Sequence, residues 1–132
     1  MVCKMLLFEH RDSEKLFFDK NRLSNFDINF YTHTLNEKSI QLLNPSDLEE
    51  AIVLSVYKFS RITEEVLSHF KNLRILSLRC DDFKHIDLRA CLERNIAVIK
   101  SEAGANSEYQ ILKKSFKDIT DVFCGCKESR IV

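Results

Sequence analysis

The stretch "AIVLSV" (residues 51–56) is a nearly continuous apolar run. A strand that is covered on both faces of a parallel sheet has this pattern, whereas a half-exposed strand alternates apolar and polar residues. Four similar short runs flank it, and successive runs start 22 to 25 residues apart: "VCKMLLF" (2–8), "FDINFY" (26–31), "RILSL" (74–78) and "IAVI" (96–99). The sequence therefore predicts five buried strands at a regular interval.

Segments with helical patterning separate these runs. They are "SEKLFFDKNRLSNF" (13–26), "SIQLL" (39–43), "ITEEVLSHF" (62–70) and "DLRACLERN" (87–95), in which Asp87 is the expected N-cap. The residues expected to face inward are Val66, Leu67 and Phe70 in the third segment and Leu88, Cys91 and Leu92 in the fourth. Alternation of strands and helices at this interval predicts βαβ units and a parallel sheet. The predicted fold is α/β, a flavodoxin-like, doubly wound five-stranded parallel sheet in three layers.

The whole chain, residues 1–132, is interpreted as a single domain. Residues 106–123, "NSEYQILKKSFKDITDVF", predict an amphipathic helix with an apolar stripe of Leu112, Phe116, Ile119 and Phe123. This helix either closes one face of the sheet, which is the favoured interpretation, or binds a partner. Residues 124–132 are expected to form a flexible tail.

Composition argues against several classes of protein. Lys plus Arg and Asp plus Glu number 20 each, and a nucleic-acid-binding domain usually has a basic excess. The start, "MVCKMLLFEHRDS", does not resemble a secretory signal, and no apolar stretch has the length of a membrane-spanning helix, so a cytoplasmic protein is expected. The chain has only two glycines, Gly104 and Gly125, which rules out a G-x-G-x-x-G dinucleotide loop and a P-loop within it.

The five cysteines do not predict a metal site. Cys124 and Cys126 form a lone C-x-C, and two thiolates are too few for structural zinc. Cys80 precedes His85 by five residues, so a Cys–His nucleophilic pair is conceivable. A histidine at the start of a helix is the favoured interpretation of His85.

Polar residues follow the first and third predicted strands, as "EHR" (9–11) and "YKFS" (57–60). In a flavodoxin-like sheet these two strand ends flank the switch point where ligands usually bind. The candidate residues of this switch-point cleft are Glu9, His10, Arg11, Tyr57, Lys58 and Ser60. A solvated loop rim is the alternative interpretation.

The stretch "LRCDDFKHIDLRACLERNIAV" (78–98) resembles the D-isomer-specific 2-hydroxyacid dehydrogenases, which have an Arg-x-x-Gly-x-x-(His or Asn)-Ile-Asp pattern before a helix and a short strand. The matching residues are Arg79, His85, Ile86 and Asp87. Three more segments are similar to this family: "LLFEHRDSEKLFF" (6–18), "VYKFSRITEEVL" (56–67) and "AGANSEYQ" (103–110). The resemblance extends over roughly residues 4–110.

The resemblance implies the catalytic, substrate-side domain of a two-domain enzyme whose Rossmann domain binds NAD. The family's catalytic Arg, Glu and His have no match in this chain, so no catalytic residue is assigned. No cofactor is expected to bind here, and NAD would take part only if a partner supplied the binding domain. The substrate-binding residues implied by resemblance are Tyr57, Lys58, Arg79, Cys80, Asp81 and Asp82. Asp82 stands at the family's glycine position, where it and Asp81 would repel a carboxylate ligand.

The function predicted from these features is that of a stand-alone catalytic domain of this family. It is expected to be inactive by itself as an NAD-dependent oxidoreductase and to act as a binding or regulatory module. Loop residues Phe59 and Phe83 motivate a first alternative, a self-associating or protein-interaction module. A second alternative is the substrate half of a split dehydrogenase, with the NAD-binding half on another chain.

Overall fold

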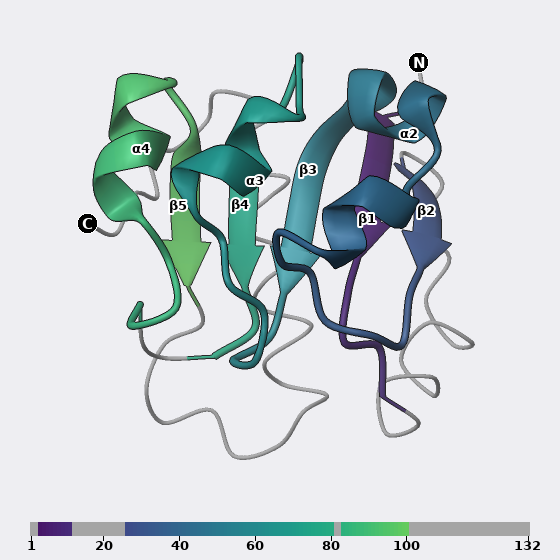
Figure 1. Cartoon of the computed structure of the whole chain (residues 1–132), viewed down its shortest axis with the longest axis horizontal. Helices are drawn as coiled ribbons and strands as arrows, with labels where there is room; N and C mark the ends of the chain where they lie inside the picture. The colour runs from purple at the N-terminus through teal and green to yellow at the C-terminus, as the bar shows by residue number, and fades with distance from the viewer. Residues whose placement is uncertain (1–2, 12–25, 81–82, 101–132) are drawn as a thin grey trace.

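The computed structural model describes residues 3–11, 26–80 and 83–100 (Figure 1). Its strands are β1 (Cys3–Leu7), β2 (Phe26–Phe30), β3 (Ala51–Val56), β4 (Ile75–Leu78) and β5 (Ala97–Lys100). Its helices are the 3-10 helix η1 (Ser39–Leu42) and the α-helices α2 (Pro45–Glu50), α3 (Glu64–Ser68) and α4 (Leu88–Glu93). The predicted helices at 13–26 and 106–123, the tail from 124, and Asp81 and Asp82 lie outside the described residues, except that Phe26 begins β2.

The five strands form one sheet in the order β2-β1-β3-β4-β5, and every neighbouring pair is parallel. This confirms the predicted α/β, flavodoxin-like sheet, in which the chain order reverses between β1 and β3. All strand arrows in Figure 1 point the same way, and α3 and α4 lie on the viewer's side of the sheet. The carboxyl ends of the strands therefore share one edge, along the bottom of that view.

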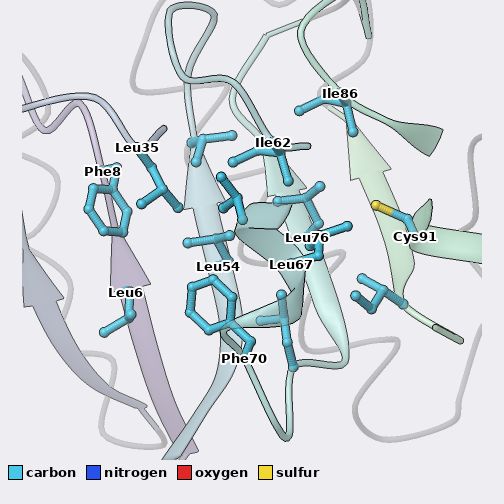
Figure 2. Packing of buried hydrophobic residues seen from close by; sticks show 14 of the residues in the cluster. Leu6, Phe8, Leu35, Leu54, Ile62, Leu67, Phe70, Leu76, Ile86 and Cys91 are labelled. Atoms are coloured by element: carbon cyan, nitrogen blue, oxygen red, sulfur yellow. The ribbon is translucent and has the colours of Figure 1, made fainter. Parts of the chain in front are cut away.

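The main hydrophobic core lies between the sheet and these helices. Leu54 and Leu76, on neighbouring strands, lie in one cluster with Leu67, Phe70 and Cys91 from the helical side (Figure 2). Each fully buried side chain of this size contributes about 1.5–3 kcal/mol to folding. The opposite face of the sheet is buried as well, as Met5, Leu7, Val53, Ile75 and Ile99 show. Burial on both faces explains why the strands are continuous apolar runs.

Helix starts follow capping chemistry. The Asp87 carboxylate accepts a hydrogen bond from the Ala90 amide at 3.0 Å, which confirms the predicted N-cap of α4. Thr63 caps α3 in the same way, through the amide of Val66 at 3.3 Å. Residues 39–42 of the predicted helical segment 39–43 form a 3-10 helix, and a separate helix, α2, follows with Pro45 in its first turn.

The inward-facing residues are confirmed in α3 and partly wrong in α4. Val66, Leu67 and Phe70 are buried, as predicted. In α4 Cys91 is buried and Leu88 is half-buried, but Leu92 is 69% exposed. The two buried residues of α4 are Ala90 and Cys91. Successive helical residues are rotated by about 100°, so a contact centred between positions 90 and 91 turns position 92 towards water.

Candidate functional site

Glu9 is the centre of the polar structure at the carboxyl edge of the sheet. It follows β1, has a positive φ of 58°, and is only 5% exposed. Its Oε2 accepts hydrogen bonds from the amide of Tyr57 at 2.9 Å and from the amide and hydroxyl of Ser60 at 3.0 and 2.6 Å. Its Oε1 accepts a hydrogen bond from the amide of Phe59 at 2.9 Å. We call these four donors, from the loop that follows β3, the Glu9 cage.

Arg79 connects the ends of three neighbouring strands. It follows β4 and is fully buried. Its Nη1 donates to the Ser55 hydroxyl at 3.0 Å, and its Nη2 donates to the carbonyl oxygens of Phe8 at 2.7 Å and Glu9 at 3.0 Å. These bonds give Arg79 an architectural role beneath the loops. The substrate contact that the family resemblance implies for Arg79 stays a prediction.

The structure brings five of the six predicted switch-point residues together, all except His10. Beyond the Glu9 contacts with Tyr57 and Ser60, the Arg11 guanidinium carbon lies 3.8 Å from the centre of the Tyr57 ring, and the Lys58 ammonium lies 5.3 Å from it. Both are cation–π distances. His10 contacts the ring of Phe30 on β2, with centroids 4.8 Å apart. A polar cluster at this edge could thus be predicted, although its ligand-binding role is a hypothesis.

A pocket of about 580 Å³ lies beside this cluster, between the loop after β3 and the loop after β4. Its lining residues are Lys58, Phe59, Ser60, Arg61, Ile62, Thr63, Lys84, His85, Ile86 and Asp87. The two loops are joined by parallel backbone bonds, from the Ile62 amide to the His85 carbonyl at 3.0 Å and from the Asp87 amide to the Ile62 carbonyl at 2.9 Å. Among the lining residues that the structure describes, three side chains are cationic and one is a carboxylate, which favours an anionic ligand.

Most of these lining residues are not among the site residues predicted from the sequence. Of the predicted site residues, only Lys58 and Ser60 belong to it. The available signal was the position of Arg61 and Lys84, each a few residues beyond a predicted strand end. Because parallel strands place their carboxyl ends at one edge, such residues meet even when they are distant in the sequence.

Cys80 and Cys91 are both buried, with free thiols. The sulfur of Cys80 lies 3.9 Å from Nε2 of His85, so these two residues are in contact. Burial, together with the charge of Asp87, raises the pKa of Cys91 to about 11, so its thiol is protonated at neutral pH. Within residues 3–11, 26–80 and 83–100, no group of three His, Cys, Asp or Glu side chains is placed to hold a metal ion. Cys124 and Cys126 lie outside these ranges.

Comparison with known proteins now places the chain. Residues 5–108 match the family model described as the D-isomer specific 2-hydroxyacid dehydrogenase, catalytic domain. The chain belongs to this family. No protein with a curated description matches its sequence.

Solved structures of such dehydrogenases share the fold of this domain. D-lactate dehydrogenase of Aquifex aeolicus, solved with NAD and lactic acid, superposes with a TM-score of 0.64 at 24% identity over 89% of this chain and 33% of its own. A D-lactate dehydrogenase of Treponema pallidum superposes with a TM-score of 0.65 at 18% identity, over 98% of this chain and 41% of its own. The NAD-bound 3-phosphoglycerate dehydrogenase of Entamoeba histolytica superposes with a TM-score of 0.61 at 16% identity, over 76% of this chain and 33% of its own. This chain thus spans about one third to two fifths of each enzyme.

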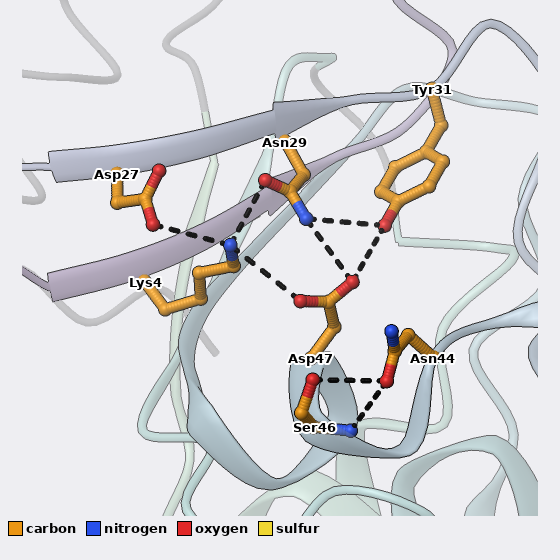
Figure 3. Close-up of polar contacts among 7 residues, drawn as sticks. All are labelled: Lys4, Asp27, Asn29, Tyr31, Asn44, Ser46 and Asp47. Carbon is orange, nitrogen blue, oxygen red and sulfur yellow. Dashed lines mark hydrogen bonds and ion pairs between the residues drawn. The ribbon is translucent and has the colours of Figure 1, made fainter.

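The dehydrogenase-like domain has a second polar cluster, which sequence analysis missed (Figure 3). The ammonium of Lys4, near the start of β1, lies 3.2 Å from a carboxylate oxygen of Asp27, 3.6 Å from one of Asp47 and 3.0 Å from the side-chain oxygen of Asn29. The Asp47 carboxylate also accepts hydrogen bonds from Asn29 at 3.2 Å and Tyr31 at 3.5 Å. We call these five residues the Lys4 cluster. It ties α2 to β1 and β2.

The Lys4 cluster holds its lysine in the charged form. Burial acts to lower the pKa of Lys4, but the hydrogen bond and charge of Asp27 and the charge of Asp47 outweigh burial and raise it. Every polar group named in the cluster already has a partner within it, which favours an architectural role.

Among the described residues, no helix has the length and apolar character needed to cross a membrane.

Proposed function

We propose that this domain binds a small organic anion in the pocket between the loops after β3 and β4. The observation that carries the proposal is the charge of the described lining residues, in which Lys58, Arg61 and Lys84 outnumber one carboxylate, that of Asp87. The repulsion expected from Asp81 and Asp82 concerns residues outside the described part of the chain. The Asp87 carboxylate already accepts the helix-capping bond of α4, so part of its charge is compensated. The switch-point edge of the sheet is where α/β domains bind ligands.

We further propose that the 132-residue chain binds this ligand without oxidising or reducing it. The family is NAD-dependent, but a glycine-rich dinucleotide loop cannot be built from Gly104 and Gly125 alone. The family's catalytic Arg, Glu and His also have no match in this chain. Hydride transfer requires a nicotinamide held against the substrate by a cofactor-binding domain. The domain acts accordingly as a binding or regulatory module.

The binding proposal is tested by titrating the purified chain with pyruvate, lactate or phosphate and following backbone amide resonances. Saturable shifts at Arg61, Thr63 and Lys84 are expected. An Arg61→Gln variant should bind several-fold more weakly, because it removes one lining cation. The matched control is Arg89→Gln, since Arg89 lies on α4 outside the pocket lining and pairs with Glu93 at the surface. Equal binding by both variants would remove the pocket from the proposal.

The second part is tested by mixing the chain with NADH and pyruvate and measuring absorbance of the nicotinamide. No turnover is expected. Turnover by the purified chain would contradict the inactive module. Turnover only after addition of a chain with an NAD-binding domain would favour the split-enzyme alternative.

A protein-interaction role is the second candidate, because Phe59 is 70% exposed on the loop after β3. Aromatic residues are enriched at protein interfaces relative to the rest of the surface. Sedimentation at increasing concentration tests whether the chain self-associates and whether Phe59→Ser abolishes this. Leu42→Ser is the control, since Leu42 is 81% exposed on η1. A monomer at all concentrations would argue against self-association.

A further inference from the structure

The Glu9 cage has the features of an anion-binding site. Three backbone amides, from Tyr57, Phe59 and Ser60, and the Ser60 hydroxyl converge on one carboxylate at 2.6 to 3.0 Å. Successive amides of a loop that point at a common centre form a concave anion site, with no need of a positively charged side chain. In this protein the anion bound by the cage is the carboxylate of Glu9, a residue of the same chain.

The cage loop is also held by contacts that do not involve the Glu9 carboxylate. The Ser60 hydroxyl accepts a hydrogen bond from the Leu35 amide at 2.9 Å, and the Arg61 amide donates to the Leu35 carbonyl at 2.8 Å. The Ile62 amide, two residues beyond Ser60, is bonded to the loop after β4. The loop that carries the donors is therefore held in place by hydrogen bonds to neighbouring backbone, independently of the anion that the donors bind.

Residue 9 is an unfavourable place for a glutamate unless its carboxylate is needed. Its φ of 58° lies in the left-handed region, which costs a non-glycine residue about 1–2 kcal/mol. Glycine would adopt this backbone without that cost. Burial of the carboxylate adds a desolvation cost that the four cage bonds offset. Arg79 fixes the backbone at this position through the Glu9 carbonyl and brings a buried positive charge near the cage.

We propose that the loop Tyr57–Ser60 is a binding site for a small carboxylate and that Glu9 fills it as an internal ligand. Because Glu9 is tethered, it competes with free carboxylates at a very high effective concentration and keeps the site closed to them. Removal of the side chain would leave a seat for one carboxylate group, of the size of formate or acetate. This inference concerns the side of the loop that faces β1 and does not depend on ligand binding in the adjacent pocket.

The decisive variant is Glu9→Gly, which vacates the cage and suits the positive φ. We expect its melting temperature to fall by about 5–10 °C in chloride. Formate or acetate, at the same ionic strength, should raise it again in a saturable manner and should shift the amide resonances of Tyr57, Phe59 and Ser60. The wild-type domain should show neither response, because its own carboxylate occupies the cage.

The matched control is Asn95→Gly. Asn95 is the other described non-glycine residue with a positive φ, also 58°, and it lies beyond α4. The substitution relieves the same backbone strain without emptying a cage, so formate should not act differently from chloride. An equal response to formate in Glu9→Gly, Asn95→Gly and the wild type would overturn the proposal, since formate would then be a general stabiliser.

Two further outcomes remain decisive if Glu9→Gly does not fold in chloride. Refolding on transfer into formate would support the proposal, and failure to refold in saturating formate would overturn it. The variant Glu9→Gln gives an independent measurement, because its amide offers one acceptor oxygen and no charge. A melting temperature clearly below that of the wild type is expected. A wild-type melting temperature would show that the loop does not require a carboxylate.

Discussion

The two ends of β1 both carry a shielded charge, but the charges are held in different ways. At the start of the strand, the ammonium of Lys4 is surrounded by side chains, namely the amide oxygen of Asn29 at 3.0 Å and the carboxylates of Asp27 and Asp47 at 3.2 and 3.6 Å (Figure 3). At its end, the carboxylate of Glu9 is bound by backbone amides and a hydroxyl of the loop after β3. One end is neutralised by opposite charges, and the other by main-chain dipoles.

This difference separates architecture from binding potential. In the Lys4 cluster the ligating groups are side chains that form ion pairs and hydrogen bonds with one another, so an added ion would have to break them. In the Glu9 cage the donors are fixed by the backbone and keep their positions whichever anion they bind. Only the second end is pre-organised for a ligand, and it lies at the edge where α/β domains bind their ligands.

The largest effect is expected from Arg79, which holds the carboxyl end together. Arg79→Leu should lower the free energy of unfolding by about 3–5 kcal/mol, because it leaves the carbonyls of Phe8 and Glu9 and the Ser55 hydroxyl without their buried donor. Urea unfolding measures this loss. Arg74→Leu is the control, since Arg74 is exposed, and it should change stability by less than about 0.5 kcal/mol. Equal effects would refute the architectural role of Arg79.

An effect of intermediate size on stability is expected at two paired serines near the carboxyl end of the sheet. Ser55 and Ser77 face each other on β3 and β4 and are 2% and 1% exposed. The Ser55 hydroxyl accepts from Arg79, whereas the Ser77 hydroxyl has no hydrogen-bond partner in the part of the chain that the structure describes. Ser55→Ala should cost about 1–3 kcal/mol, and Ser77→Ala should be neutral or stabilising. A larger loss for Ser77→Ala in urea unfolding would contradict this assignment.

The sheet could be predicted because its signal is local and strong. Each of the five strands lies within one or two residues of an apolar run, since burial on both faces of a parallel sheet leaves no room for polar alternation. The Asp87 cap could be predicted as well, because capping depends on a side chain three residues from its target. The meeting of Glu9 with Tyr57 and Ser60 followed from the topology alone.

Other features could not be predicted, because they depend on contacts between residues that are far apart in the sequence. The burial of Arg79 requires three acceptors from two other strand ends to converge on it, and a sequence gives no sign of that convergence. The Lys4 cluster joins residues 23 to 43 positions apart. In contrast, α2 had a readable signal that was missed, because Asn44 followed by Pro45 is a typical N-cap and first-turn pair.

The smallest effect is expected at the amino end of β1. Lys4→Met should cost about 1–2 kcal/mol at pH 7, because it leaves Asp47 partly buried without its cation. Lys71→Met is the control, since the pair of Lys71 with Glu49 spans 3.9 Å at the surface and such pairs contribute little. Denaturant unfolding of both variants against the wild type gives the two differences.

The pH dependence of that difference tests its electrostatic origin. The pKa of Lys4 is raised in the folded domain above its ordinary value of 10.5, so the folded state keeps the proton longer than the unfolded chain. The contribution of Lys4 is then fully present below pH 10.5 and is lost as the pH rises through the folded pKa. The Cys91 thiol, whose pKa is raised to about 11, weakens folding at alkaline pH in both proteins and cancels in the comparison. The gap between wild type and Lys4→Met should therefore stay constant from pH 7 to about 10 and narrow above it. A gap that persists unchanged at high pH would mean that the aliphatic part of Lys4, and not its charge, stabilises this end of the strand.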